Sequence, residues 1–463
     1  HADLATDFAL PVTDGDTTTV NLTGKLAALK GLEQAVGLIG PDGKLAAHAT
    51  LKKTGDGQDI HLDTFTLDGK TLHLVANAAA TTKDSKTTLD NAQASLTLTD
   101  LAAAAKMLRG KAKLDLTASG PLDDLEAKAH LDSDFGTATM PRGPVTLDLE
   151  ATHLPTAPEA HLTAGGSLDR APLAVDLKAA QDKDGNRKLE IAKLEWNSIH
   201  GRGTLDVPGG RKLPLGTIDL KATRLADLKN LIGQPISGSF DASLKSTAAG
   251  QDGPLKATVN VTGDVAVAPY RVGALKLTGF VLDPEGSPRA DLSLLLDRLS
   301  APSVAGSLKA TVKGPQTALA VDANGRFPQL YGAPGALDVS AVADIPGQSV
   351  RISRLTANAR GEALKLEAPV KVSYGKTLGV DRLRATLAPP GVSPANIDIA
   401  GTVKPALNMT ASLKNVTPAL AKPFAPTLHA AGTLAADAKL SGTLEAPRGH
   451  VQLNGRGLKM MTG

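Results

Sequence analysis

Apolar and polar residues alternate one by one along much of this chain, which is the pattern of a β-strand with one buried face. In residues 111–118, every second residue is aliphatic and the residues between them are charged or hydroxylated. The same alternation recurs in residues 127–132, 145–150, 173–179, 255–262, 308–313 and 364–367. The sequence therefore predicts many strands, each with one aliphatic face and one polar face.

We expect these aliphatic faces to lie side by side and to line one apolar groove. Alternation alone assigns residues to the lining, and a register error of one residue would move a whole strand to the other face. The residues assigned to the groove are Ala112, Leu114, Leu116, Leu147, Leu149, Leu173, Val175, Leu177, Leu255, Val259, Val261, Leu308, Val312, Leu364 and Leu366.

Dipeptides typical of tight turns separate the alternating runs. Asp-Gly begins at Asp14, Asp42, Asp56, Asp68, Asp184 and Asp252, and Asn-Gly begins at Asn324 and Asn454. Both dipeptides tolerate the positive φ angles of hairpin loops, and hairpins join antiparallel neighbours. We therefore predict an all-β fold, a long twisted and curved antiparallel sheet with a few short helices. Because Gly and Pro are spread evenly, residues 1–463 are predicted to be one continuous repetitive groove segment.

Four short stretches have helical signals instead. Aliphatic residues with helical spacing, Leu26, Leu29, Leu32, Val36 and Ile39, form the first stretch, and Gly40-Pro41 ends it. Asp100 is a candidate N-cap for a helix over 101–108, Thr223 for one over 225–232, and Thr417-Pro418 for a further turn. The 225–232 helix is expected either to cap the groove or to touch a membrane surface.

The composition narrows the functional classes. Aromatic residues make up only 2% of the chain, whereas enzyme cores and pockets use bulky rings. The 50 Lys+Arg and 47 Asp+Glu are dispersed, with no clustered basic face, so nucleic acid is not a predicted partner. The chain has no Cys, which excludes thiol catalysis and disulfides. It also lacks a run of ~20 apolar residues or a signal peptide, so we expect a fragment whose N-terminal anchor and C-terminal end are missing.

Known catalytic motifs are absent from the sequence, so we predict no enzyme activity, no cofactor and no metal site. Asp182, Asp184 and Asn186 resemble the opening of a calcium loop, but Glu190 has the wrong spacing and a hairpin turn explains the segment. Trp196 and Tyr270 are expected to anchor a rim at a membrane or partner, or to pack over the end of a sheet.

A degenerate unit recurs at three of the predicted helices: a short helix, an alternating strand, a Gly-x-Leu turn and a second alternating strand. Its clearest examples are residues 228–244, Leu-Lys-Asn-Leu-Ile-Gly-Gln-Pro-Ile-Ser-Gly-Ser-Phe-Asp-Ala-Ser-Leu, and the Ser-Gly-x-Leu repeats at Ser119 and Ser441. Over nearly the whole chain this texture resembles the AsmA-like superfamily in its TamB branch, the inner-membrane component of the translocation and assembly module.

The resemblance implies a periplasmic, taco-shaped β-sheet with an apolar trough in a Gram-negative bacterium. It implies an inner-membrane anchor through an N-terminal helix missing here, and an outer-membrane barrel partner of the TamA/Omp-assembly type. The expected client is phospholipid, moved between the inner and outer membranes in support of outer-membrane biogenesis.

Two alternatives stay open at this point. The chain could instead be a chaperone-like factor for outer-membrane protein or autotransporter assembly, which pairs its sheet edge with nascent strands. It could also be a structural or adhesive β-solenoid, in which the Leu and Val faces form a closed core.

Overall fold

The computed structural model describes residues 2–9, 17–26, 33–248, 250, 253–422, 425 and 429–460. The chain divides into two compact units, His1–Pro235 and Ile236–Gly463, and each is described by itself. Strand accounts for 74% of the described residues and helix for 4%, so the predicted all-β, antiparallel fold with very few short helices is confirmed.

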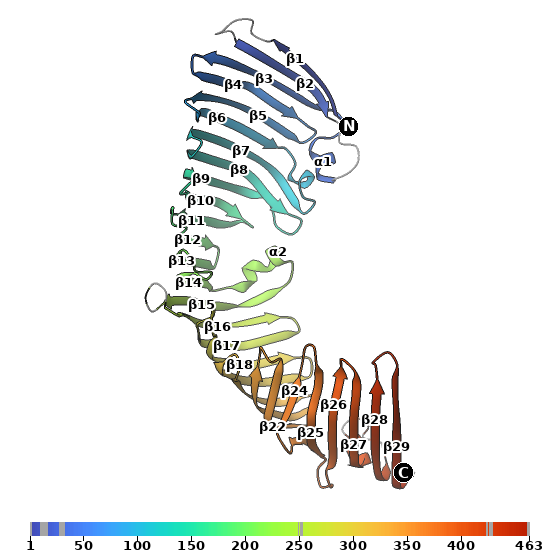
Figure 1. The fold of residues 1–463 in the computed structure, drawn as a ribbon. Helices are drawn as coiled ribbons and strands as arrows, with labels where there is room; N and C mark the ends of the chain where they lie inside the picture. The colour runs from blue at the N-terminus through green and yellow to red at the C-terminus, as the bar shows by residue number, and fades with distance from the viewer. Residues whose placement is uncertain are drawn as a thin grey trace. The chain divides into compact units, whose positions relative to one another are not determined.

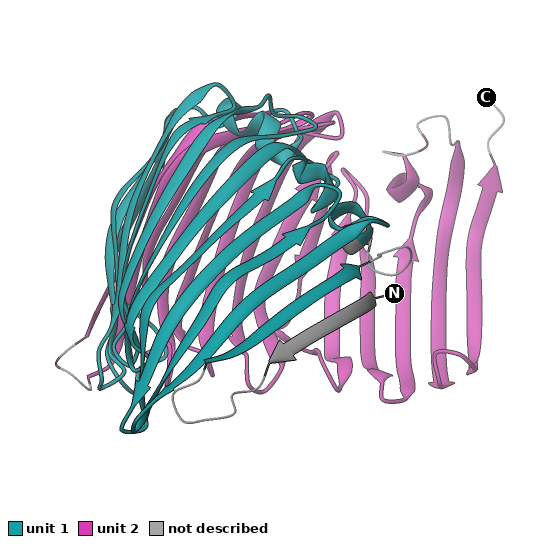
Figure 2. Cartoon of the chain, turned by 90° about the horizontal axis from the view of Figure 1, so that it is seen from above, with its two compact units in different colours: residues 1–235 teal, residues 236–463 magenta. Residues whose placement is uncertain are grey.

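Unit 1 is an antiparallel meander in which each strand pairs with the next one along the chain (Figure 1). Its strands bend along their length and form a curved wall, drawn in teal in Figure 2. The strands are β1 (Ala2–Ala9), β2 (Thr17–Leu26), β3 (Gly43–Thr54), β4 (Gly57–Asp68), β5 (Leu72–Lys83), β6 (Lys86–Leu98), β7 (Leu108–Pro121), β8 (Asp124–Thr137), β9 (Gly143–Pro155), β10 (Glu159–Leu168), β11 (Ala171–Gln181), β12 (Arg187–Trp196), β13 (Ile199–Val207) and β14 (Leu215–Ala222).

Unit 2 repeats the same meander with one interruption. β23 and β24 both pair with β22 and with β25, so they occupy a single position in the ladder. Pro369 lies between them and has no amide hydrogen to donate to the ladder. The strands are β15 (Ile236–Ala248), β16 (Leu255–Val267), β17 (Tyr270–Leu282), β18 (Arg289–Ala301), β19 (Val304–Pro315), β20 (Leu319–Leu330), β21 (Ala333–Asp344), β22 (Ser349–Ala359), β23 (Glu362–Leu366), β24 (Val370–Ser373), β25 (Leu378–Ala388), β26 (Ala395–Lys404), β27 (Leu407–Val416), β28 (Ala430–Gly442) and β29 (Pro447–Met460).

The helices are shorter than the sequence predicts. They are α1 (Glu33–Leu38), η1 (Leu101–Ala103), η2 (Leu225–Leu228), α2 (Lys229–Ile232) and η3 (Pro418–Ala421). Asp100 does cap η1, because its carboxylate accepts a hydrogen bond from the Ala102 amide at 2.9 Å. The predicted cap at Thr223 is wrong, since Arg224 holds the N-cap position of η2 without a side-chain hydrogen bond. Residues 27–32 of the first predicted helix lie outside the described residues.

Turn signals were informative at Asp-Gly and misleading at Asn-Gly. Asp56, Asp68 and Asp184 lie at hairpins, Asp42 precedes β3, and Asp14 and Asp252 lie outside the described residues. Asn324 and Asn454 are wrong as turns, because they lie inside β20 and β29. At Gly325 the Phe327 ring occupies the space that a side chain would need, since an added Cβ would lie 2.7 Å from it.

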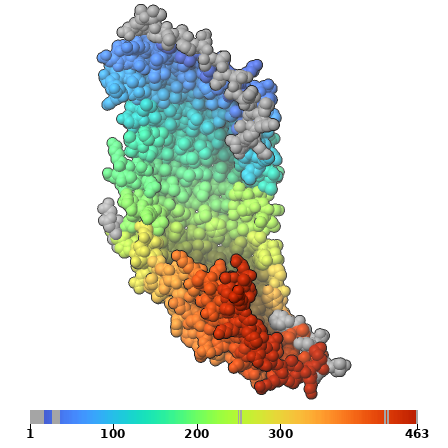
Figure 3. All heavy atoms as spheres, turned by 45° about the vertical axis from the view of Figure 1, so that its right-hand side comes forward, coloured from blue at the N-terminus to red at the C-terminus, as the bar shows by residue number. Residues whose placement is uncertain are grey.

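The core of the molecule is thin. Only fourteen apolar side chains of the described residues are buried, several of them at strand ends or beside the short helices, such as Leu101, Ala222 and Leu225. The chain exposes 27175 Å², whereas two separate globular domains of half its mass would expose about 20,000 Å² together. The space-filling view shows the blue to green strands of unit 1 as an unbroken wall (Figure 3). Most apolar side chains therefore lie on a sheet face and not in a closed interior.

Candidate functional site

The most ordered apolar feature of unit 1 is a row of leucines that runs across the strands. Directly paired residues on antiparallel strands present their side chains on the same face. The pairing of β3 to β9 joins one leucine from each of seven consecutive strands. This leucine row is Leu45, Leu67, Leu74, Leu96, Leu114, Leu131 and Leu147.

A second row on the same face contains only alanine. The pairing of β5 to β11 again joins one residue from each of seven consecutive strands. This alanine row is Ala78, Ala92, Ala118, Ala127, Ala151, Ala160 and Ala179. On β7, Ala118 and the leucine-row residue Leu114 are four residues apart, so Leu116 lies between them.

The alanine row is the floor of a shallow apolar cavity of about 470 Å³. Alanines of β5 to β9 build this floor, and Leu62, Leu116, Leu149 and Leu154 stand around them. The volume lies within the range of about 300–1,000 Å³ that is typical of ligand pockets. The cavity can therefore hold an apolar molecule.

The face is open along the cavity. Leu116, at its centre, remains 40% exposed. Strand packing in unit 1 joins ladder neighbours, as β7 with β6 and β8, and among the described residues no second sheet lies over them. The apolar surface is thus accessible to a ligand from solution.

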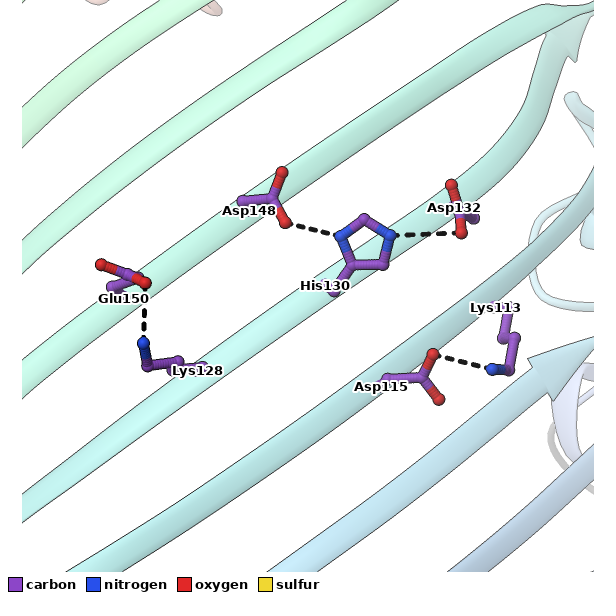
Figure 4. Close-up of polar contacts among 7 residues, drawn as sticks. All are labelled: Lys113, Asp115, Lys128, His130, Asp132, Asp148 and Glu150. Carbon is purple, nitrogen blue, oxygen red and sulfur yellow. Dashed lines mark hydrogen bonds and ion pairs between the residues drawn. The ribbon is translucent and has the colours of Figure 1, made fainter.

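The opposite face of the same strands is charged. On β7, β8 and β9 the residues between the apolar ones form ion pairs (Figure 4). Lys128 Nζ lies 2.9 Å from Glu150 Oε1, and Lys113 Nζ lies 2.8 Å from Asp115 Oδ2. The sheet in this region therefore has one face for water and one face for apolar contact.

His130 is the centre of a small acidic group on this polar face. Its Nδ1 lies 2.5 Å from Asp148 Oδ1 and its Nε2 lies 3.2 Å from Asp132 Oδ2 (Figure 4). Hydrogen bonds to Asp148 and then to Asp132 raise the pKa of His130 above its usual value. The Lys128 hydrogen bond lowers the pKa of Glu150, and the Lys113 hydrogen bond lowers the pKa of Asp115.

The structure places all eight predicted groove residues of unit 1 on the apolar face. Leu114, Leu147 and Val175 are linked through the leucine row and Ala164. Leu116, Leu149 and Leu177 are linked through Ala129 and Leu162. Ala112 and Leu173 are linked through Ser133, Val145 and Gly166. Leu116 and Leu149 line the cavity, and the other six lie beside it on the same face.

The seven predicted residues of unit 2 also share one face of that unit. Pairing links Val259 to Val312 through Gly279 and Leu292. It links Leu308 to Leu364 through Gly325, Leu337 and Ala357. Leu255, Val261 and Leu366 follow by alternation along β16 and β23. Leu255 and Leu366 are buried, so they contact protein and offer little surface to a ligand.

The alanines that floor the cavity were not among the predicted residues. Only their register brings them together, because Ala78 and Ala151 are 73 positions apart in the chain. A local signal did exist in Ala76, Ala78 and Ala80, which alternate within β5. Because alanine also occurs on the opposite face of β5, as at Ala79, the alanines mark the apolar face less clearly than leucine or valine does.

Of the other candidate residues, Trp196 and Asp182 have structural roles and Tyr270 is exposed. Trp196 is not at a rim: it is 6% exposed and its Nε1 donates to the Leu168 carbonyl at 2.8 Å. Asp182 accepts from the backbone amides of Asp184 and Asn186 at 2.9 Å, which makes a hairpin turn. In the described part of the chain, His, Asp and Glu form no group of three that could hold a metal ion. Tyr270 is exposed at the start of β17.

Known proteins offer no counterpart for this site. No protein-family model, curated protein or solved structure matches the chain. No helix among the described residues has both the length and the apolar character to cross a bilayer. What the cavity can bind therefore rests on its own geometry.

Proposed function

We propose that this chain binds lipid by its acyl chains on the open apolar face of the sheet and carries it along that face. The observation that supports the proposal is the unbroken leucine row beside an accessible apolar cavity, on a sheet whose other face is charged. An exposed hydrophobic face of this extent is a mark of a binding surface.

The energetics favour an acyl chain as the ligand. Each CH₂ moved from water into an apolar environment gains about 0.8 kcal/mol, so a sixteen-carbon chain gains on the order of 10 kcal/mol. This is an upper limit, because an open face covers one side of the chain and ordering it costs conformational entropy. The free energy that remains is still enough to retain the lipid. Each successive strand offers a similar apolar contact, so the lipid can move from strand to strand.

The proposal extends to the setting that the repeat texture implies. We propose that the client is phospholipid moving between inner and outer membranes in the periplasm, with an outer-membrane barrel protein as partner. The supporting features are the Ser-Gly-x-Leu texture at Ser119 and Ser441 and the repetition of the apolar face from strand to strand. Fractionation of cells that express the tagged full-length protein tests the location, and recovery in the cytosol would contradict it.

The test uses neighbouring residues of β7 that point to opposite faces. Leu116→Asp puts a charge in the cavity. Thr117 also borders the cavity, but it pairs directly with Lys128, whose ammonium lies on the polar face, so Thr117→Asp puts the same charge on that face. Leu116 is already 40% exposed, so the substitution leaves the sheet folded, as far-UV circular dichroism will verify. Phospholipid that copurifies is extracted and counted per protein by mass spectrometry.

We expect wild type and Thr117→Asp to retain phospholipid and Leu116→Asp to lose most of it, because bound lipid would cover the new carboxylate and leave it without water or a partner. Wild-type protein that is free of lipid, and stays so after incubation with phosphatidylcholine vesicles, would overturn the proposal. Equal retention by both variants would mean that lipid binds elsewhere.

A further inference from the structure

The apolar face of unit 1 is not uniform in depth. On one side of the alanine row lies a row that includes Leu89, Leu125 and Leu154. On the other side lies a row in which Leu116 on β7 and Leu149 on β9 are joined by Ala76, Ala94 and Ala129 on β5, β6 and β8. Neighbouring rows are about 7 Å apart along a strand. The methyl groups of the alanine row therefore leave a furrow that leucines border on both sides at β9 and on one side at β6, β7 and β8.

The furrow is long and crosses the strands. Adjacent strands are about 4.8 Å apart, so the five alanines that line the cavity span about 19 Å and all seven span about 29 Å. Its direction is therefore the direction in which the sheet extends, and its shape suits a narrow, extended molecule.

The side chains on the face of the furrow carry no charge, and Lys128, which borders the cavity, directs its ammonium to Glu150 on the polar face. In β5 to β11, the described positions that share this face contain no Asp, Glu, Lys or Arg. A nascent polypeptide strand with charged side chains, or a lipid headgroup, would lose its hydration there without gaining a partner. An uncharged hydrocarbon chain has no such hydration to lose, so it is the occupant that fits this face.

Resting on the proposed function, we propose that the alanine row is a bed for a single straight acyl chain of a phospholipid, lying across β5 to β9. The small size of the alanine side chains, and not apolar area alone, then decides which chains fit. A methyl-branched chain fits less well, because its side groups meet the leucines that border the furrow, such as Leu149 and Leu154 on β9.

The test fills the furrow without making it polar. Ala118 and Ala127 are directly paired, so Ala118→Leu with Ala127→Leu raises the floor while adding apolar surface. Ala79→Leu is the matched control, since Ala79 follows Ala78 on β5 but pairs with His61 and Asn91 on the opposite, polar face. Each protein is stripped of lipid and incubated with vesicles of palmitoyl-oleoyl phosphatidylcholine or of diphytanoyl phosphatidylcholine, whose chains are methyl-branched.

We expect wild type and Ala79→Leu to take up the straight-chain lipid about tenfold better than the branched lipid, the effect of losing contact with about two CH₂ groups. The filled variant should lose the straight-chain lipid by a similar factor and show no preference. If lipid binding depends only on apolar area, the filled variant will bind as well as wild type or better, and the inference fails.

The result separates this inference from the proposed function. If Leu116→Asp abolishes uptake but the filled variant keeps it, lipid binding stands and the single-chain bed is wrong. If wild type takes up neither lipid, both ideas are wrong.

Discussion

Single residues in this protein are divided between two environments by their position along a strand. On β8, Ala127, Ala129 and Leu131 point to the apolar face, while Lys128 and His130 point to water. The ion pairs on the polar face are at least one third exposed, and exposed pairs contribute at most about 1 kcal/mol each. Their main effect is to keep that face hydrated.

His130 gives the polar face a measurable pH dependence. Asp148 and Asp132 raise its folded pKa above the unfolded value of about 6.5. The resulting stabilisation is fully present below the unfolded pKa and is lost as the pH rises through the raised folded pKa. We therefore expect His130→Gln to lower the midpoint of urea unfolding more at pH 5.5 than at pH 8.5.

The control removes the charges of the two acidic partners. In a background that carries Asp132→Asn and Asp148→Asn, the effect of His130→Gln on the urea midpoint should no longer change with pH. In the wild-type background, a His130→Gln effect of equal size at both pH values would show that these carboxylates do not hold the proton.

Among the elements, the short helices act as covers for strand ends. η1 buries Leu101 to 7% exposure, and only three residues separate the cap at Asp100 from its end. An element this short has little stability of its own, so its capping hydrogen bond matters.

Asp100→Ala should destabilise the protein by about 1 kcal/mol, because the Ala102 amide loses its acceptor. Asp100→Asn keeps a side-chain oxygen at the same place and should restore most of the loss. Urea unfolding measures both variants. If Asn is as destabilising as Ala, the carboxylate charge and not the cap is what counts.

At the scale of the whole molecule, stability is distributed along the meander. Each strand packs against its ladder neighbours, so the free energy of unfolding is close to a sum of strand and neighbour terms. Long repetitive arrays of this kind depart from two-state unfolding.

The single tryptophan makes this testable, because Trp196 lies in unit 1 and reports on the strands around it. We expect the urea transition followed by Trp196 fluorescence to differ in midpoint from the transition followed by far-UV circular dichroism, which averages over all strands. Superimposable transitions would show that the described strands unfold as one cooperative block.

The sequence by itself determined which residues share a face within each strand, because side-chain alternation is a local property of the extended backbone. It therefore sufficed for the all-β fold, and for the prediction that the eight chosen residues of unit 1 share one face and the seven of unit 2 share another. It also indicated the Asp100 cap, whose signal lies within three residues.

Only the tertiary structure decided which strands' residues meet. The leucine and alanine rows depend on register, and β-bulges such as the one between Leu89 and Ala92 shift that register by amounts no local pattern reveals. Tertiary contacts also overrode the Asn324 turn signal, shortened the helix after Asp100 to η1, and buried Trp196. In each case tertiary contacts outweigh local propensity. The strand register that they fix also decides where small and large side chains meet on the face that we propose to bind lipid.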